Sequence, residues 1–338
     1  MEIERANQVL TASEIFDLVR EDLELVEKAI DVESVASVET VTTIGRYLQQ
    51  SGGKRLRPAL LLLCARFAGG GANPANAKTA VQLGAVVEMI HAATLVHDDV
   101  IDVAQTRRGR PSANVQWGNH ICVLAGDWLY MQAFQAALRE RNFHVLDLLI
   151  GLTQLMVEGE LIQLDRIGQI SITEADCMEL VDRKTASLFS ACARLGAISS
   201  GADEQQETLL GDFAWNLGMA FQLVDDILDF TSREQTLGKP VGGDLKEGKV
   251  TLPLVYTLET AAPAERGMVE QVLEKRNYDA VPFAEILALV ERHSGIQRTR
   301  ERAQQFTDHA RQIVSEFPEN PYQRALFTLT DLVTARDR

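Results

Sequence analysis

The sequence predicts an all-α protein, and three observations lead to that prediction. The 338 residues include only nine prolines, and aromatic side chains make up 6% of the chain. The long runs of Ala, Leu and Val do not alternate with polar residues as half-buried strands do, so they favour helices. The only breaks are short, such as residues 69–74 and 199–205, and there is no solenoid repeat or low-complexity linker. We therefore expect one continuous helical domain over residues 1–338.

The charge balance excludes several classes of partner. With 33 basic and 48 acidic side chains the formal charge is −15, which repels nucleic acid and anionic membranes. The first 30 residues are acidic and amphipathic, without the basic start and apolar core of a signal peptide, so a cytoplasmic protein is expected. Four cysteines stand singly among apolar residues without CxxC spacing, which predicts reduced core thiols rather than ligands. They are Cys64, Cys122, Cys177 and Cys192.

The longest apolar stretch, residues 79–96, predicts a core helix from Lys78 to about Val103. It contains Glu88 and His91 and runs directly into two aspartates, so we do not expect it to span a membrane. Thr173 with Asp176 three residues later resembles a capping box.

Two later segments can be assigned in the same way. The capping box predicts a helix that continues through residue 195, and residues 209–230 are apolar nearly all round, as in a central helix. The Gly- and Lys-rich residues 237–249 predict a loop.

Two of these helices carry the same acidic spacing, D-D-x-x-D. Asp98 and Asp102 lie one turn apart on one helix face, and so do Asp225 and Asp229. One copy alone is as typical of a solvated helix end as of a binding site. Two copies on buried helices favour a binding site. Like charges at this spacing destabilise a helix by about 0.2–0.5 kcal/mol, and by more when they are desolvated. A cation must compensate them.

The residue types select the cation. Carboxylates without His or Cys partners suit Mg²⁺, with Mn²⁺ as an alternative, and Mg²⁺ is usually bound by one or two carboxylates together with waters and substrate phosphates. This predicts half of a diphosphate site. His91 precedes Asp98 by seven residues and shares its stripe, and from geometry alone a structural role and a ligand-binding role are equally expected for it.

Basic residues in turn-rich segments supply the other half of such a site. The segment "SGGKRLRP" contains Lys54, Arg55 and Arg57, "TRRGRP" contains Arg107 and Arg108, and Lys239 and Lys249 follow the second acidic motif. The "GGK" is not a P-loop, because the G-x-x-x-x-G-K-[ST] pattern is absent.

Together these motifs resemble those of the trans-isoprenyl diphosphate synthases, and specifically their long-chain polyprenyl members. The resemblance covers almost the whole chain. It rests on "GGKRLRP", "HAATLVHDDVID", "RRGRPS", "LAGDWLY", "RKTASLF", "FQLVDDILDF" and "LGKPVGGDLKEGKVTLPL", in the family's order.

The resemblance implies an all-α barrel or bundle around a central cavity, usually paired as a homodimer, and it implies roles for single residues. Asp98 and Asp102, supported by Asp99, would hold Mg²⁺ on the allylic diphosphate, and Asp225, Asp226 and Asp229 would hold a further ion. Arg107 would bind the same diphosphate, while Lys54, Arg57, His91 and Arg108 would bind isopentenyl diphosphate. Lys184, Thr185, Gln222 and Lys239 would complete the allylic side, with Lys249 as a weaker candidate.

The implied activity is successive trans condensation of isopentenyl diphosphate with an allylic diphosphate. Short-chain members block the product tunnel with aromatic residues four or five positions before the first aspartate, where this chain has Thr94 and Ala93. An octaprenyl-like product for quinone side chains is therefore expected. Met131 and Phe134 are candidates for the tunnel floor, with ordinary core packing as an equal alternative for each.

Two other function classes share some of these features. A terpene cyclase would have an acidic motif and Mg²⁺ but would not need the basic cluster at Lys54, Arg57 and Arg108. A catalytically silent subunit of a heteromeric synthase would usually have eroded acidic motifs, and both are intact here.

Overall fold

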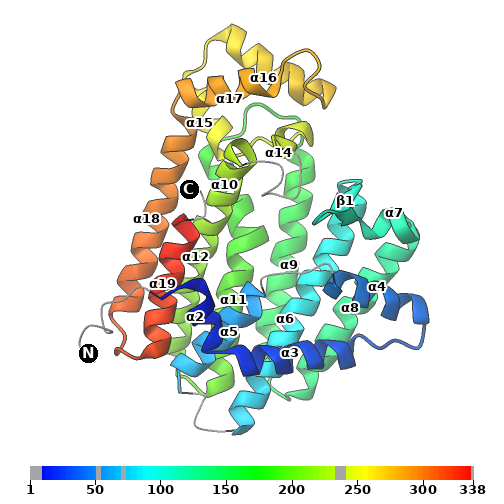
Figure 1. The fold of residues 1–338 in the computed structure, drawn as a ribbon, viewed down its shortest axis with the longest axis vertical. Helices are drawn as coiled ribbons and strands as arrows, with labels where there is room; N and C mark the ends of the chain where they lie inside the picture. Colours follow the sequence, from blue (N-terminus) through cyan, green and yellow to red (C-terminus); the bar gives the residue numbers. More distant parts are fainter. Residues whose placement is uncertain (1–9, 51–54, 70–73, 233–240, 336–338) are drawn as a thin grey trace. The chain divides into compact units, whose positions relative to one another are not determined.

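The computed structural model describes residues 10–50, 55–69, 74–232 and 241–335, and most of them lie in helices (Figure 1). Within these ranges the strands are two residues long, β1 (Thr106–Arg107) and β2 (Arg110–Pro111), and they form one antiparallel hairpin. The predicted all-α fold is confirmed.

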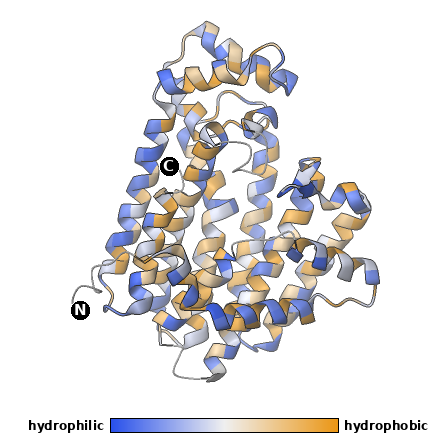
Figure 2. Cartoon of the chain, viewed as in Figure 1, coloured by the Kyte–Doolittle hydropathy of each residue, from blue (hydrophilic) through white to orange (hydrophobic). Residues whose placement is uncertain are grey.

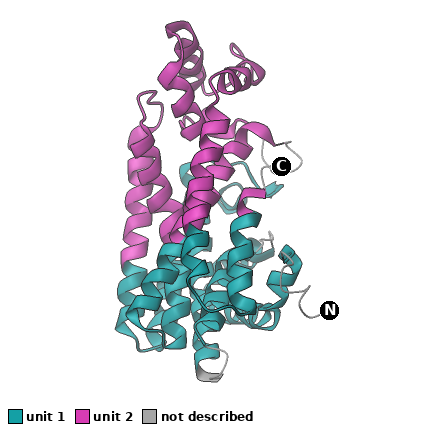
Figure 3. Cartoon of the chain, turned by 90° about the vertical axis from the view of Figure 1, so that its left-hand side faces the viewer, with its two compact units in different colours: residues 1–150, 189–214, 310–332 teal, residues 151–188, 215–309, 333–338 magenta. Residues whose placement is uncertain are grey.

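The chain divides into two compact units (Figure 3). Unit 1 contains residues 1–150, 189–214 and 310–332, and unit 2 contains residues 151–188, 215–309 and 333–338. Some helices contribute residues to both units. The single domain expected over residues 1–338 stays a prediction.

Unit 1 is built around one long helix, α6 (Pro74–Ile101), close to the range that the sequence predicts. It packs against α3, α5, α7 and α8. Leu83, Val86, Ile90 and Val96 of α6 are fully buried, and burying one such side chain contributes about 1.5–3 kcal/mol. The other elements of this unit are α2 (Ala12–Asp17), α3 (Arg20–Glu33), α4 (Glu39–Gln50), α5 (Leu56–Phe67), α7 (Ala113–Trp117) and α8 (Asn119–Arg139).

By length and composition, Asn76–Ile101 within α6 is apolar enough to cross a membrane. However, 61% of its most apolar window is buried inside the protein, as expected for the core helix of a globular unit. Charged and polar side chains also interrupt this helix, as noted for Glu88 and His91.

Helices shared by the two units are α9 (Phe143–Arg166), α11 (Ser187–Ser200), α12 (Glu204–Thr231), α18 (Gly295–Ser315) and α19 (Pro321–Ala335). Figure 2 shows polar residues along much of α18, while its Ala303, Phe306, Ala310 and Val314 are buried. This spacing gives α18 one buried and one solvated face.

Unit 2 contains α10 (Glu174–Val181), a π-helical turn η1 (Asp182–Ala186), α14 (Gly243–Lys246), α15 (Leu252–Thr260), α16 (Pro263–Lys275) and α17 (Phe283–Arg292). Thr173 and Asp176 form the predicted capping box at the start of α10. Trp215 of α12 donates a 2.6 Å hydrogen bond from Nε1 to Asp182, and its ring meets Phe306 edge-on. These contacts anchor the π-helical turn to two long helices.

One expectation about local structure is wrong. The sequence predicts a loop over residues 237–249, of which 237–240 lie outside the described residues; within the rest, residues 243–246 form the short helix α14. The backbone N–H groups of Gly243 and Asp244 donate to the Asp229 carboxylate at 3.2 and 3.3 Å, which satisfies the first donors of this turn. A cap supplied by a distant residue cannot be seen in the local sequence.

The four cysteines are free and buried, as predicted. Burial raises the pKa of Cys192 to about 12, and it also raises the pKa of Cys64 and Cys177. Their thiols therefore stay protonated and act as small apolar groups.

Candidate active site

The first aspartate motif lies where α6 ends. The N–H of Asp102 donates to the carbonyl of Asp98 at 2.8 Å, so helical spacing continues through both residues. The chain then turns through Val103, whose φ of +51° is unusual for a β-branched residue. The N–H of Ala104 closes this turn on the carbonyl of Asp99 at 2.9 Å. This helix end presents the Asp98 and Asp102 carboxylates one turn apart, and both are half-buried.

Asp99 differs from Asp98 and Asp102 in its burial. It is completely buried, and its Oδ1 accepts a 2.6 Å hydrogen bond from Nε of Arg107. Its Oδ2 is also buried and has no hydrogen-bond partner.

The hairpin of β1 and β2 carries the basic residues that follow this motif. Arg108 and Gly109 occupy its two-residue turn with φ of +52° and +74°, as a type I′ turn requires. Arg107 pairs with Arg110 across the hairpin, and the Arg110 guanidinium lies 4.3 Å from the centre of the Tyr47 ring. The turn thus separates three arginines: one faces Tyr47, one contacts Asp99, and Arg108 lines a pocket.

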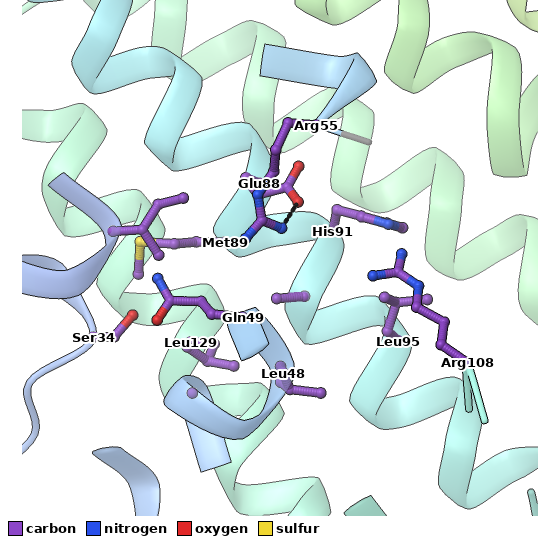
Figure 4. A pocket seen from close by; sticks show the side chains of 13 residues that line it. Ser34, Leu48, Gln49, Arg55, Glu88, Met89, His91, Leu95, Arg108 and Leu129 are labelled. Atoms are coloured by element: carbon purple, nitrogen blue, oxygen red, sulfur yellow. Dashed lines mark hydrogen bonds and ion pairs between the residues drawn. The ribbon is translucent and has the colours of Figure 1, made fainter. Parts of the chain in front are cut away.

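That pocket lies in unit 1, between side chains from α3, α4, α5, α6 and α8 and Arg108 of the hairpin (Figure 4). It encloses about 460 Å³, including its open mouth. Arg55, Glu88, His91 and Arg108 supply its charged and imidazole groups, and Figure 4 shows Gln49 apart from them, on the side of Ser34, Met89 and Leu129. The rest of the lining is Ile30, Ser34, Gly45, Leu48, Met89, Ala92, Leu95 and Leu129.

His91 is surrounded by positive charge. Nη1 of Arg57 lies 3.1 Å from Nε2 of His91, and burial together with Arg57, Arg108, Arg107 and Arg55 holds the pKa of His91 well below its usual value. The imidazole is therefore neutral at pH 7. Since a guanidinium can only donate, Nε2 accepts and the ring proton resides on Nδ1. A neutral donor among cations suits an anionic ligand.

The arginines around His91 are not equivalent. Arg55 contacts Glu27, and its Nη1 donates to Glu88 at 2.8 Å. Burial disfavours its charge, but Glu27 and Glu88 outweigh burial and raise the pKa of Arg55. By contrast, burial and the neighbouring arginines lower the pKa of Arg108, despite the opposing effect of Glu88. An anion bound in the pocket would therefore stabilise the positive charge of Arg108.

Helix α8 supports the aspartate motif through residues of "LAGDWLY". His97 packs against Gly126 so closely that a Cβ there would lie 2.2 Å from Nε2, and this nitrogen lies 3.1 Å from the Val123 carbonyl. Only glycine fits at that position. Burial and the negative charge of Asp98 raise the pKa of Tyr130 to about 12, which places its phenol in the field of the motif.

The second motif, in unit 2, also divides into different environments. Asp226 is buried, and burial together with Asp244, Asp225 and Asp229 raises its pKa well above the usual range. Asp229 caps α14 as described. Four carboxylates thus share one region of unit 2, and burial together with their mutual repulsion disfavours the charged form of Asp226.

A chain of hydrogen bonds leads from this motif to the π-helical turn. Thr185 donates to Oε1 of Gln222 at 2.9 Å, and Nε2 of Gln222 donates to Asp226 at 3.0 Å. The two bonds fix the orientation of the Gln222 amide. Lys184 contacts Glu160 and donates to Gln163 of α9 at 3.0 Å. The structure therefore brings Thr185 and Gln222 together, as their shared allylic assignment requires.

The remaining predicted residues have different positions. Lys54 and Lys239 lie outside the described residues. Nζ of Lys249 donates to Glu247 at 2.7 Å. Ala93 is fully buried and Thr94 is half-buried, whereas Met131 is 64% exposed and Phe134 is half-buried.

The donor set fits Mg²⁺ with a diphosphate better than a cation bound by protein alone. Among the described residues no group of three His, Cys, Asp or Glu is already gathered as a metal site. Two carboxylates one turn apart leave most of an octahedral shell to water and phosphate oxygens, which is the usual arrangement for Mg²⁺. Asp98 with Asp102, and Asp225 with its neighbours, are the residues that would hold such ions.

Comparison with known proteins identifies the family. The sequence profile described as polyprenyl synthetase matches residues 38–290. The chain belongs to this family. Octaprenyl diphosphate synthase of Escherichia coli (strain K12) is 35% identical over 329 residues, covering 97% of this chain and 100% of that protein. The family assignment makes this chain a prenyltransferase enzyme.

Solved structures agree with this assignment. A decaprenyl diphosphate synthase from Rhodobacter capsulatus has a TM-score of 0.90 at 36% identity, covering 96% of this chain and 99% of that one. A polyprenyl synthase from Caulobacter crescentus CB15, complexed with calcium and isoprenyl diphosphate, has a TM-score of 0.91 at 33% identity, covering 98% and 100%. These relatives are named for products of different length, so family membership leaves the product length open.

Three residues of these sites are absent from the sequence-based set. Asp244 adds a carboxylate to the second motif, and Glu160 pairs with Lys184. Gln49 lines the pocket, and its amide nitrogen is buried without a hydrogen-bond partner. The Asp in "GGDLKEGK" was a usable signal for Asp244, because an acidic residue in a Lys- and Gly-rich segment is conspicuous. The local sequence around Gln49 and Glu160 contains no pattern that predicts a role in the site.

The lowered pKa of His91 predicts how stability depends on pH. Below pH about 6.5 the unfolded chain binds a proton at this residue that the folded protein does not, so the unfolding free energy should fall as pH falls, by up to about 1.4 kcal/mol per pH unit. Above that pH the contribution is constant. Denaturant unfolding at pH 5.5 and 7.5 should show that His91→Asn loses less stability at pH 5.5 than the wild type. Equal losses would show that His91 titrates normally.

Proposed function

We propose that this enzyme condenses isopentenyl diphosphate with an allylic diphosphate in successive trans additions and makes a long-chain, octaprenyl-like diphosphate for isoprenoid quinones. The main support is the neutral His91 surrounded by arginines in unit 1. It lies on the same face of α6 as Asp98 and Asp102, about two helical turns or 10 Å from Asp98 and about three turns or 16 Å from Asp102. An anion site and a metal-binding carboxylate pair at this separation suit two diphosphate substrates.

The pocket residues bind and orient isopentenyl diphosphate in this proposal. Arg57 and Arg108 supply positive charge, and His91 donates its Nδ1–H to a phosphate oxygen. The amide nitrogen of Gln49 adds a neutral donor. Arg55 is committed to Glu27 and Glu88, so it stabilises the pocket wall. Lys54 has the same assignment from the sequence.

The allylic diphosphate is assigned to the aspartate motifs with Arg107, Lys184, Lys239 and, more weakly, Lys249. Bound Mg²⁺ (or Mn²⁺) supplies the positive charge that stabilises the departing diphosphate. The allylic C–O bond breaks and its electron pair leaves with the diphosphate. The double bond of isopentenyl diphosphate then forms the new C–C bond, and the proton lost from the adduct passes to the departing diphosphate. Thr185 and Gln222 present oxygen atoms toward the carbocation.

A homodimer is part of the proposal. On α8 the exposed residues Ile121, Leu124, Met131 and Leu138 follow one helix face and are 41%, 66%, 64% and 45% exposed. A stripe of this kind typically binds another protein surface. A second copy would cover it, and a tunnel-floor role for Met131 requires such a cover.

Location and alternative functions follow from the same features. The net charge of −15 supports a cytoplasmic enzyme without nucleic-acid or membrane partners. A terpene cyclase would have no need for the pocket of His91 and Arg108, and a silent subunit would have no need for two intact motifs. Incubation of the purified chain alone with Mg²⁺, farnesyl diphosphate and isopentenyl diphosphate separates the three: only the proposed enzyme elongates the primer.

The metal requirement is directly testable. Activity should require Mg²⁺ or Mn²⁺ and disappear with a chelator, and Asp98→Ala or Asp225→Ala should lower turnover by orders of magnitude because the leaving group loses its compensating charge. Thermal unfolding should show that both variants remain folded, since a repelling charge is removed. Asp147→Ala, at an exposed site on α9, is the matched control and should keep wild-type turnover. Near-normal turnover in either motif variant would refute the assignment.

Arg108 and Arg110 provide a matched pair for the isopentenyl diphosphate site. Arg108→Gln should raise the apparent KM for isopentenyl diphosphate about 10- to 100-fold, the usual effect of losing a charge-assisted hydrogen bond of about 1.5–3 kcal/mol. Arg110→Gln changes an arginine that faces Tyr47 and should leave this KM near the wild-type value. Steady-state kinetics with each substrate varied separately would measure both. An effect of Arg108→Gln on the allylic primer alone would mean that the two sites are exchanged.

Product length should depend on Ala93. This side chain is fully buried on α6. Overpacking a closed interior costs about 1–3 kcal/mol, so the surrounding residues would not move aside for a larger side chain. A large residue at this position should therefore fill the product tunnel and stop chain growth. We expect a long product from the wild type and mainly farnesyl or geranylgeranyl diphosphate from Ala93→Tyr, at a comparable initial rate. Chromatography of the dephosphorylated products measures the lengths. Ala93→Val, with a smaller added volume, should give intermediate products, and unchanged lengths in both folded variants would exclude a tunnel beside Ala93.

A further inference from the structure

The middle aspartate of the first motif does not share the geometry of the other two. At about 100° per residue, Asp98 and Asp102 are separated by about 40° around α6, whereas Asp99 is about 100° from Asp98 and about 60° from Asp102. The structure agrees with this: Asp98 and Asp102 are half-buried, and Asp99 is completely buried. A cation held by Asp98 and Asp102 would not face the side chain of Asp99.

Asp99 instead holds the turn that follows the helix. Its backbone carbonyl accepts the N–H of Ala104 at 2.9 Å, and its carboxylate accepts Nε of Arg107 at 2.6 Å. Ser112 then contacts the Ala104 carbonyl through its hydroxyl. Both ends of the segment from the helix to the hairpin are therefore fixed on one residue.

The contact also determines how Arg107 can act. A buried carboxylate is costly unless a cation pairs with it, and here the side chains of Asp99 and Arg107 are 1% and 30% exposed. Because the contact uses Nε, the two terminal NH₂ groups of Arg107 remain for other partners. An arginine anchored at Nε keeps its outer donors in one orientation, so less rotamer entropy is lost when they bind a phosphate.

We propose that Asp99 is a positioning residue for Arg107 and does not bind the metal ion. This rests on the proposed function, in which Arg107 binds the allylic diphosphate. Asp98 and Asp102 then bind the metal, while Asp99 prepares the arginine that receives the same diphosphate. For Asp99 to reach a metal ion, its carboxylate would have to leave the buried pair and release Arg107.

The test separates metal binding from diphosphate binding without turnover. Mn²⁺ binding is measured by electron paramagnetic resonance at a pyrophosphate concentration that saturates the wild type and every variant, so that weaker pyrophosphate binding does not lower it. Binding of farnesyl thiodiphosphate, a slowly reacting allylic analogue, is measured by calorimetry. Asp98→Asn should weaken Mn²⁺ binding at least about 10-fold. Asp99→Leu should leave Mn²⁺ binding within about twofold and weaken the analogue about 10- to 100-fold, as expected for losing an oriented charged donor.

Conservative and double variants complete the design. Asp99→Asn keeps an oxygen acceptor for Nε, so it should restore analogue binding to within about threefold of the wild type. Arg107→Gln should resemble Asp99→Leu, and the double variant Asp99→Leu/Arg107→Gln should be no weaker than either single variant, because the two residues act as one unit.

Two results would overturn the proposal. Loss of Mn²⁺ binding in Asp99→Asn, matching Asp98→Asn, would make Asp99 a metal ligand. Additive losses in the double variant would show that Asp99 and Arg107 act independently. If Asp99→Leu does not fold, the near-isosteric Asp99→Asn and the Arg107→Gln variant still decide between these outcomes. Failure of the wild type to bind the analogue would instead refute the proposed function, which keeps the two failures distinct.

Discussion

Like charges held close together on rigid helices are the constraint on which the rest of this structure depends. In unit 1, burial and the charges of Arg55, Arg57, Arg107 and Arg108 lower the pKa of His91. In unit 2, burial and three neighbouring carboxylates raise the pKa of Asp226. Neither arrangement is favourable by itself, since each concentrates one sign of charge in a partly desolvated place. The arrangement around His91 becomes favourable when an anion binds, and the arrangement around Asp226 becomes favourable when a cation binds.

The fold tolerates this repulsion between like charges because the charged residues lie at the ends of well-buried helices. Helix α6 has a core of fully buried aliphatic side chains before its aspartates, and α8 approaches it closely through Gly126. Two residues at the edge of the site, Val103 and Arg108, adopt positive φ angles that cost roughly 1–2 kcal/mol for a non-glycine residue. Packing elsewhere in unit 1 offsets that cost, so the turn and the hairpin keep the orientation of Arg107 and Arg108.

Features that depend on spacing along one helix could be predicted from the sequence, and features that depend on partners elsewhere could not. The 3.6-residue period predicts that Asp98 and Asp102 share a face, and the capping rule predicts the start of α10. The burial of Asp99 depends on Arg107 in a later hairpin, and the helix α14 depends on a cap from Asp229. Gln49 and Glu160 are ordinary polar residues of α4 and α9 until the fold places Gln49 in the pocket lining and Glu160 against Lys184.

The two arginines of "KRLR" show why motif membership does not determine a role. Both lie at the start of α5, yet Arg55 contacts Glu27 and Glu88, whereas Arg57 lies against the neutral His91 and 5.8 Å from the centre of the Phe189 ring. The carboxylates compensate the charge of Arg55, while the guanidinium of Arg57 lies 3.1 Å from the imidazole of His91. The same division separates Arg107, paired with Asp99, from Arg108. In each pair one arginine contacts a carboxylate of the protein, and the other lies against His91 or lines the pocket. A single substitution can therefore test one role without removing the other.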